Sequence, residues 1–266
     1  MSTNDAKASR QSLRSGQIQA SLDSLGSNWA TVHVADQVTS TNVEVLKLSS
    51  EVRPGNAIAL TADEQVRGRG RLEREWSSPW GAGIALSICC SIDDVAGEVT
   101  SVPLRTGLAV VTALQDHGVA SAVKWPNDIV TIDDPMRKLG GILVSLHPDV
   151  LVIGIGLNVS LTHDELPTQQ ATSLSLLGHH IDRELLIGRI IHSVEKQIAN
   201  DDWVTQYRAH CRTLGQEVRI SRVGDESIVG LATDISGAGE IIVDIDGELL
   251  SVSVGDVEHL RLSKEA

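Results

Sequence analysis

Apolar residues along the chain follow two patterns that indicate different elements. Continuous apolar runs of about four to eight residues are typical of buried strands, whereas apolar positions three or four apart are typical of helices. The two patterns alternate up to about residue 215. The runs that predict strands are 56–63, 83–92, 122–125, 129–132, 139–146 and 150–160. Because only short turns separate the last four, we expect them to be neighbours in one sheet.

Segments of helical periodicity separate these strands, and several carry signals of a helix end. Thr41 and Glu44 have the spacing of a capping box, Pro103 stands at a tolerated first-turn position, and Asp182 is a typical N-cap residue. The predicted helices span 13–26, 41–50, 103–117, 183–200 and 203–214. Residues 1–12 are small and polar, so we expect them to be disordered.

The pattern changes after Gly215, where short alternating segments rich in Val and Ile are separated by Gly and Asp turns. The segments that predict strands are 217–223, 227–235, 240–246 and 249–254. We therefore expect a domain boundary near residue 215, followed by a small all-β module of the size of a five-stranded barrel at about 216–262.

Composition argues against several classes of protein. With 35 acidic and 22 basic side chains the net charge is -13, which disfavours nucleic-acid binding over most of the surface. No apolar run approaches the roughly 20 residues that span a bilayer, and no signal-peptide pattern is evident, so we expect a cytoplasmic protein without membrane contact. The three cysteines lack C-x-x-C spacing, which supports neither a disulfide framework nor a zinc site.

Against this acidic background, four arginines fall within residues 67–74, interleaved with Gly68 and Gly70. Exposed arginines often form no more than a solvated face. Alternating glycines, however, let backbone N–H groups approach a ligand while guanidinium groups bind phosphate or carboxylate in a bidentate manner. The combination favours an anion-binding loop delivered by the strand at 56–63.

Three further stretches could carry chemistry. "KWPND" (124–128) is ordinary turn sequence, yet Asp128 could orient Mg²⁺ or an incoming amine. Lys138 opens an apolar strand just before two glycines; it is either a guard against edge pairing or a cation placed where a ligand can approach. Asn158, inside an apolar strand, needs a hydrogen-bond partner, which is either structural or a bound ligand.

Taken in order, these stretches resemble the biotin protein ligases over about residues 31–262. The matching motifs are "STN" (40–42), Gln65 ahead of "GRGR" (68–71) with Trp76, "KWPND" (124–128), "RKLGGIL" (137–143), "GIGLNV" (154–159) and "ATSL" (171–174). Each motif alone is weak, but six in the expected order are specific. The resemblance implies an α+β fold in three parts. These are a disordered or short helical segment at 1–30, a mixed-sheet catalytic domain of the biotin/lipoate ligase type at 31–215, and an SH3-like β-barrel at 216–266.

The same resemblance implies a two-step reaction. Biotin and ATP, with Mg²⁺, give biotinyl-5′-AMP, and a lysine of a biotin carboxyl carrier domain then accepts the biotin. The short segment before residue 31 resembles the monofunctional type without a DNA-binding module, and the expected state is a monomer or a weak, ligand-dependent homodimer. A lipoate or octanoate ligase on the related fold and a nucleic-acid-binding regulator are the alternatives.

Roles carried over from the family fall into three groups. Catalytic roles are implied for Lys138, Arg69, Arg71 and Asp128, and Asp128 is also the candidate metal ligand. Biotin contacts are implied for Ser40, Thr41, Asn42, Gln65, Gly68, Arg69, Gly70, Arg71, Trp76, Lys138 and Gly141. Nucleotide contacts are implied for Arg69, Arg71, Trp76, Asn127, Lys138 and Asn158. Thr41 keeps its alternative role as a helix cap.

The arginine segment departs from the family where it continues as Leu72, Glu73, Arg74 and Glu75, and where Arg67 replaces a small residue. Two carboxylates beside an anion site lower its positive charge. We expect residues 63–77 to be mobile without ligand, since binding energy could order such a loop.

Overall fold

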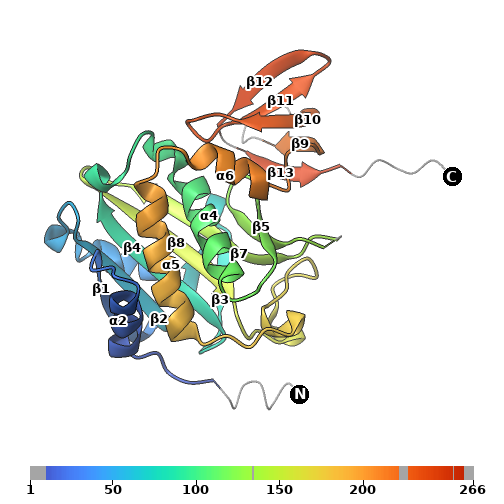
Figure 1. The fold of residues 1–266 in the computed structure, drawn as a ribbon. Coiled ribbons are helices and arrows are strands. Elements are labelled where there is room, and N and C mark those ends of the chain that lie inside the picture. The colour runs from blue at the N-terminus through green and yellow to red at the C-terminus, as the bar shows by residue number, and fades with distance from the viewer. Residues whose placement is uncertain (1–9, 134, 222–226, 254, 261–266) are drawn as a thin grey trace.

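The computed structural model describes residues 10–133, 135–221, 227–253 and 255–260, with every side chain in these ranges except that of Glu73. They form a large α+β domain followed by a small β-domain, drawn at the top of Figure 1. Residues 1–9 of the segment predicted to be disordered lie outside the described residues. Arg10 does not fit that prediction, because its buried side chain pairs with Glu165 at 2.6 Å.

The large domain is built on an eight-stranded mixed sheet in the order β1-β2-β4-β8-β7-β6-β5, with β3 paired to β2. Its strands are β1 (Ala30–Val38), β2 (Ala57–Arg69), β3 (Glu75–Ser78), β4 (Gly83–Ser91), β5 (Ser121–Lys124), β6 (Asp128–Thr131), β7 (Lys138–Leu146) and β8 (Val150–Asn158). Only β1 and β2 pair in parallel; the other pairs are antiparallel. The apolar runs therefore predicted six of these strands, and the last four are neighbours as expected, but β1 and β3 were not predicted.

Alternation along β4 separates the two faces of this sheet. Ile84, Leu86 and Ile88 belong to the main core, which also holds buried residues of the long helices. Cys89 belongs to a second, smaller core with residues of the short helix α3, and the Ser87 hydroxyl donates to Asn42 of that helix at 2.5 Å. The long helices thus cover one face, shown toward the viewer in Figure 1, and α3 lies on the other.

The described helices are α2 (Ser15–Ser24), α3 (Thr41–Leu46), α4 (Val102–Gln115), α5 (Arg183–Ile198) and α6 (Trp203–His210). Asp182 caps α5 as predicted, because its carboxylate accepts from the N–H groups of Glu184 and Leu185. The helix predicted at 203–214 ends earlier, at His210. α2 packs against α5, so this short N-terminal helix belongs to the core of the large domain.

The predicted capping box at the start of α3 is wrong. Ser40 occupies the N-cap position and makes no side-chain cap bond, while Thr41 is already inside the helix. The Thr41 hydroxyl donates instead to Gln65 Oε1 at 3.0 Å, and Glu44 pairs with Lys47 at 2.6 Å. The helix is also shorter than expected, with a separate 3₁₀ turn at Ser49–Glu51.

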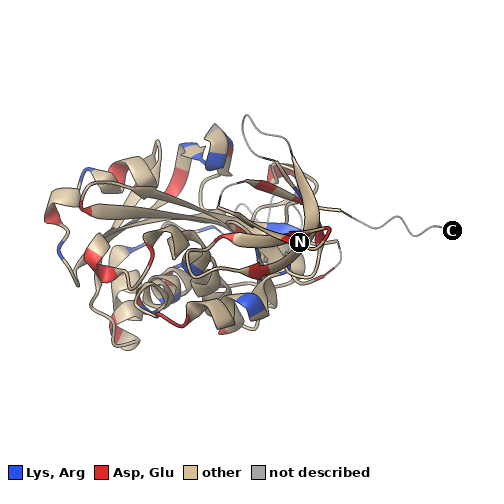
Figure 2. Cartoon of the chain, turned by 90° about the horizontal axis from the view of Figure 1, so that it is seen from above, with Lys and Arg blue, Asp and Glu red and all other residues tan. Residues whose placement is uncertain are grey.

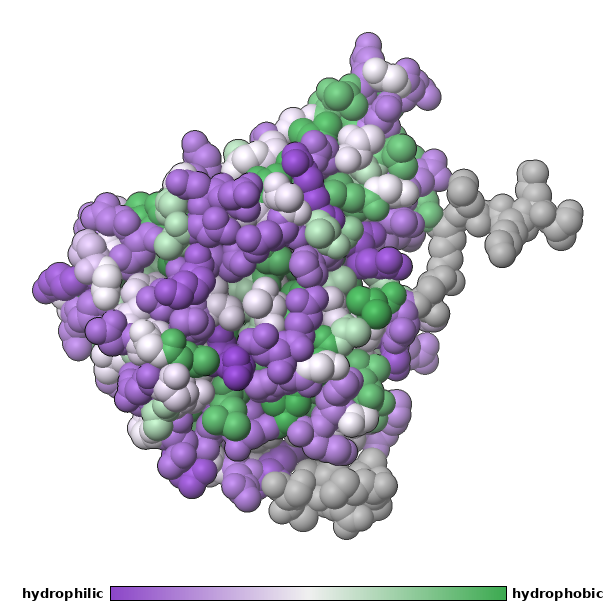
Figure 3. Space-filling model, in the orientation of Figure 1, coloured by the Kyte–Doolittle hydropathy of each residue, from purple (hydrophilic) through white to green (hydrophobic). Residues whose placement is uncertain are grey.

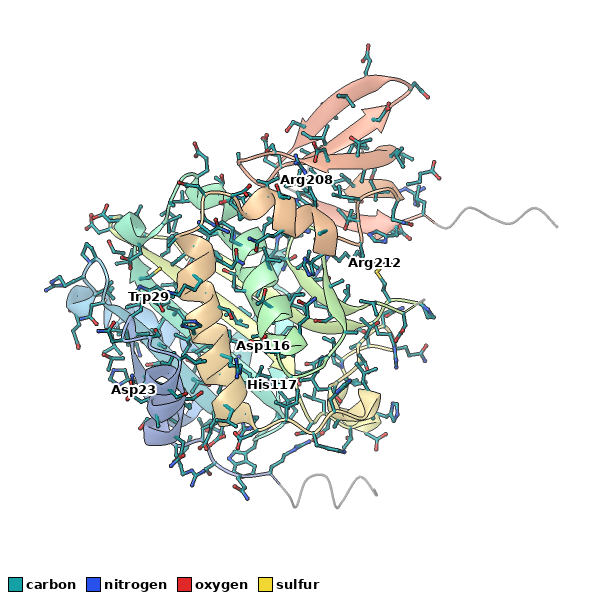
Figure 4. All side chains as sticks on the ribbon, viewed as in Figure 1. Asp23, Trp29, Asp116, His117, Arg208 and Arg212 are labelled. Carbon is teal, nitrogen blue, oxygen red and sulfur yellow. The ribbon has the colours of Figure 1, made fainter. Side chains whose placement is uncertain are left out.

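The C-terminal domain is a five-stranded antiparallel sheet in the order β12-β11-β10-β9-β13. The alternating pattern predicted four of these strands, but not β13. Its strands are β9 (Glu217–Ser221), β10 (Ile228–Ile235), β11 (Ile241–Ile245), β12 (Glu248–Val252) and β13 (Asp256–His259). Arg208 on α6, labelled in Figure 4, pairs with Asp234 at 2.5 Å, and Trp125 donates to the Gly239 carbonyl at 2.9 Å. These contacts fix the small domain beside the β5–β6 turn.

The surface matches the acidic composition. Acidic and basic residues are spread over both domains in Figure 2, and the face in Figure 3 is mainly hydrophilic with small hydrophobic groups. Among the described helices, none combines the length and apolar character needed to cross a bilayer.

Candidate functional site

A pocket of about 490 Å³ opens on the α3 face of the main sheet. Its walls come from α3, the β2–β3 hairpin, the β5–β6 turn, strands β7 and β8, and strand β13 of the C-terminal domain. It brings together most of the residues that the sequence singled out, namely Ser40, Thr41, Asn42, Gln65, Arg69, Gly70, Arg71, Trp76, Asn127, Asp128, Lys138, Gly141 and Asn158.

Gly68 is the exception among the predicted site residues, since it does not line the pocket. A Cβ at this position would lie 2.5 Å from the Trp76 carbonyl oxygen. Gly68 therefore permits the close pairing of β2 with β3, and its role in the structure is to bring Trp76 into place.

One end of the pocket is a network of neutral polar groups. Gln65 Oε1 accepts from the Thr41 backbone N–H at 2.8 Å and from the Thr41 hydroxyl at 3.0 Å. The Ser87 hydroxyl on β4 lies 2.7 Å from Thr41 Oγ1 and 2.5 Å from Asn42 Oδ1, and its single proton can be donated to either of them. Ser87 is fully buried, and no motif pointed to it in the sequence. Amides and hydroxyls in this arrangement both donate and accept, which suits a neutral polar ligand.

Trp76 forms the apolar middle of the pocket, and two glycines make room for it. A Cβ on Gly156 would lie 2.4 Å from Trp76 Cε2, closer than side chains approach one another. A Cβ on Gly154 would lie 2.4 Å from Asn42 Oδ1. The glycines of "GIGLNV" therefore allow the indole and α3 to pack directly on β8, which explains this motif without a dinucleotide.

A cation stands at the other end. Lys138 Nζ lies 2.5 Å from Asp128 Oδ1 and 5.9 Å from the centroid of the Trp76 ring. The Lys138 backbone also pairs with the segment before "ATSL", since its N–H donates to the Gln170 carbonyl at 2.7 Å. The backbone of Lys138 is paired with β6 on one side and with the segment at 170–172 on the other, which fixes the position of its Cα. Its ammonium faces the pocket.

The arginine segment is less of a loop than the sequence predicted. β2 continues through Arg69 and pairs with β3, so only residues 70–74 form the tip of a hairpin. From this tip Arg71 donates to Asn127 Oδ1 at 3.3 Å and to the Gly255 carbonyl at 3.3 Å. Partial burial lowers the pKa of the Arg71 guanidinium, chiefly by desolvation. Whether residues 63–77 are mobile without ligand stays a prediction.

The two asparagines have structural partners. Asn127 Nδ2 donates to the Ile142 carbonyl at 2.9 Å, and Asn158 Nδ2 donates to the Thr172 carbonyl at 2.9 Å. Trp125, the large side chain of "KWPND", is 1% exposed and binds the C-terminal domain. Its role is therefore mainly to join the two domains.

Several lining residues were not predicted as site residues. Lys124 belongs to "KWPND", and burial lowers the pKa of its ammonium, with Asp128 opposing this effect. Arg74, Ser221, Asp256 and Glu258 also line the pocket. Nearby, burial lowers the pKa of His259 to about 4. Lys124 could have been found from its motif, but no local signal connects β13 to site residues at 40–158, far earlier in the chain.

Comparison with known proteins agrees with this architecture. A model of the biotin/lipoate A/B protein ligase family matches residues 34–161, and a model of the biotin protein ligase C-terminal domain matches residues 213–260. The biotin–[acetyl-CoA-carboxylase] ligase of Mycobacterium tuberculosis is 32% identical, with 89% of this chain and 91% of that protein covered. The bifunctional ligase/repressor BirA of Salmonella typhimurium is 28% identical, with 93% and 78% covered.

Among solved structures, the biotin protein ligase of Aquifex aeolicus in complex with biotin and ATP superposes with a TM-score of 0.70. It is 27% identical, and the match covers 87% of this chain and 99% of that one. Both domains and their order along the chain thus match one group of relatives. The chain belongs to the biotin protein ligases of the biotin/lipoate A/B protein ligase family.

Proposed function

We propose that the pocket joins biotin to ATP and passes the activated biotin to a lysine of a biotin carboxyl carrier domain. The protein is a ligase with biotin and ATP as substrates. The observation that carries the residue assignments is the position of Lys138, whose ammonium lies between Asp128 and Trp76 in one pocket with Arg71 and the neutral polar network.

The three zones of the pocket match the three parts of biotin. The ureido ring would exchange hydrogen bonds with the network of Ser40, Thr41, Asn42 and Gln65, which can both donate and accept. The apolar chain would lie along Trp76. Its carboxylate would then reach Lys138, where a fixed cation can hold it.

In the first step, a carboxylate oxygen of biotin attacks the α-phosphorus of ATP. A new O–P bond forms, the bond to the β-phosphate bridge breaks, and pyrophosphate leaves with that electron pair. Lys138, Arg69 and Arg71 would neutralise the charge gathered on the carboxylate and α-phosphate. Asn127, which contacts Arg71, and Asn158 would lie toward the nucleotide.

In the second step, the carrier lysine amine attacks the acyl carbon of biotinyl-5′-AMP, an amide forms, and AMP leaves. The attacking nitrogen must lose a proton. Asp128, at the rim of the β5–β6 turn, is the assigned acceptor of that proton or the residue that orients the amine. Once substrate is bound, Asp128 would give up its contact with Lys138 and contact the carrier amine instead.

The donor set suits Mg²⁺ only as a companion of ATP. Among the described residues, no group of three His, Cys, Asp or Glu side chains could hold a metal ion. Mg²⁺ in such sites is typically held by one or two carboxylates together with substrate phosphates, and Asp128 can supply one carboxylate. When bound, the ion would offset phosphate charge. We also propose that the protein is cytoplasmic and that it is a monomer or a weak, ligand-dependent homodimer.

A carrier biotinylation assay tests the function directly. Pure protein with ATP, Mg²⁺, biotin and a carrier domain should add one biotin to the carrier, read by intact-mass spectrometry, and release pyrophosphate. Lipoate and octanoate in place of biotin should give no acylated carrier. Absence of transfer with biotin, or equal transfer with lipoate, would contradict the proposal.

Gly156→Ala should weaken biotin binding without unfolding the protein. The added methyl group would take space that Trp76 occupies, at 2.4 Å from Cε2, so the indole must leave β8. We expect the KM for biotin to rise by about tenfold to a hundredfold, because biotin would lose its contact with one aromatic wall of the pocket. Steady-state biotinylation at varied biotin concentrations measures it.

A double-mutant cycle provides the control for this change. If displacement of Trp76 is the cause, Gly156→Ala should add almost no further loss in a Trp76→Ala background. Additive losses in the double variant would show that the methyl group acts elsewhere, for example on the pairing of β8 with β7.

A further inference from the structure

The tip of the arginine hairpin is held by the C-terminal domain. Arg74 forms an ion pair with Asp256, the first residue of β13, and Arg71 donates to the carbonyl oxygen of the neighbouring Gly255 at 3.3 Å. These partners are 182 and 184 residues apart along the chain. Arg74 and the residues around it are also where the sequence departs from the family.

The conformation of the tip shows why it needs such support. Leu72 adopts a left-handed conformation with φ 52° and ψ 40°, which a residue with a Cβ adopts only at a cost. Its side chain is 54% exposed, so packing does little to offset this cost. Inside the hairpin, the Gly70 N–H donates to the Arg74 carbonyl at 2.7 Å. This bond closes the turn but does not direct the tip toward the pocket.

The contacts with β13 supply that direction. The Arg71 guanidinium donates to Asn127 Oδ1 of the β5–β6 turn and to the Gly255 carbonyl. These two hydrogen bonds hold it across the pocket. Arg74, two-thirds exposed, extends away and anchors the tip to the Asp256 carboxylate. An exposed ion pair contributes little to global stability. It can still shift a loop between open and closed positions several-fold, because that equilibrium involves few other contacts.

We propose that Asp256 is a positioning residue, which uses Arg74 to hold Arg71 over the ATP site. The C-terminal domain thereby acts in the adenylation step itself. This inference rests on the proposed function for its kinetic readout, but the placement of the hairpin can be measured without substrates.

Asp256→Asn in the full-length protein is the test. The KM for ATP, measured by biotin-dependent pyrophosphate exchange, should rise by about threefold to tenfold, while kcat changes less than about twofold because bound ATP still draws the tip closed. Trypsin cleavage after Arg71 or Arg74 without substrates should accelerate by a similar factor. The melting temperature should match that of the unaltered protein.

Two further variants separate positioning from a general loss of charge. Asp246→Asn removes one negative charge from an exposed turn of the same domain and should leave KM, kcat and cleavage unchanged. The charge-swapped Arg74→Asp/Asp256→Arg protein should recover most of the lost affinity for ATP. In about 0.5 M salt, the difference between Asp256→Asn and the unaltered protein should shrink.

Unchanged KM and cleavage in Asp256→Asn would overturn the inference, and so would faster adenylation, which would make the ion pair a restraint on the open pocket. Failure of the swapped pair to recover would also count against it. If the unaltered protein shows no biotin-dependent exchange, the proposed function fails. The trypsin comparison would still decide whether Asp256 places the hairpin.

Discussion

Lys138→Ala should reduce the rate of biotinyl-5′-AMP formation by about a hundredfold to a thousandfold, the usual loss when one preorganised donor to a developing charge is removed. The ammonium stands 2.5 Å from Asp128 and over the Trp76 ring, at the end of the pocket where carboxylate and α-phosphate would meet. Without it, two anions would approach each other beside an uncompensated Asp128 carboxylate.

The measurement is biotin-dependent exchange of labelled pyrophosphate into ATP. Because the Lys138 side chain is partly exposed and its backbone hydrogen bonds do not depend on its identity, the melting temperature should stay close to that of the unaltered protein. Lys138→Arg retains the charge but not the compact ammonium, and should fall between the two. Full activity of Lys138→Ala in a folded protein would remove this residue from its assigned role.

Most strands of the two sheets could be predicted because their signals are local in the sequence, whereas β1, β3 and β13 were not predicted. Apolar runs such as 83–92 and 150–160 can bury both faces only inside a sheet, and short polar turns between neighbours leave little choice of pairing. Helix α5 could be predicted in the same way, because the N-cap residue Asp182 directly precedes a segment of helical periodicity. In these segments the element that the local sequence favours is also the one that packs in the fold, so the sequence predicts it.

The start of α3 shows where local reasoning fails. Thr41 and Glu44 have the spacing of a capping box, but the Thr41 hydroxyl donates to Gln65 and lies within hydrogen-bond distance of the Ser87 hydroxyl instead. These partners arrive from β2 and β4, far along the chain. A buried polar network outcompetes a cap on a helix end because its groups cannot turn to water instead.

The candidate site divides in the same way. Motifs in order, read as a resemblance, predicted most of the residues that line the pocket. The contributions of β13 and of Ser87 were not predicted, because Asp256 and Glu258 look like solvated charges and Ser87 looks like an interruption in a strand. Only the docking of the small domain beside the β5–β6 turn gives Asp256 a partner, and that docking depends on contacts such as the one between Trp125 and Gly239.

Arg105 is another residue whose role the sequence did not predict. It lies on an otherwise apolar helix, α4, and is 0% exposed. From α4 it donates to the carbonyls of Ala96, Gln197, Ile198 and Asn200, with 2.5 Å to Ala96 and 2.8 Å to Gln197. The last carbonyls of α5 have no partner within their own helix. Burial lowers the pKa of this guanidinium, and no carboxylate among the described residues pairs with it directly. It therefore serves as the C-terminal cap of α5.

Arg105→Met should lower the free energy of unfolding by about 3–5 kcal/mol, because several carbonyls would be left buried without donors while the methionine fills most of the space. Arg189→Met is the matched control. Arg189 on α5 pairs at 3.0 Å with Asp116 at the end of α4, and both side chains are partly exposed, so its loss should cost less than about 1 kcal/mol. Asp116 is labelled in Figure 4. Urea denaturation followed by tryptophan fluorescence measures both. Equal stability of the two variants would mean that water or a backbone shift satisfies the end of α5, and that the buried charge is tolerated rather than required.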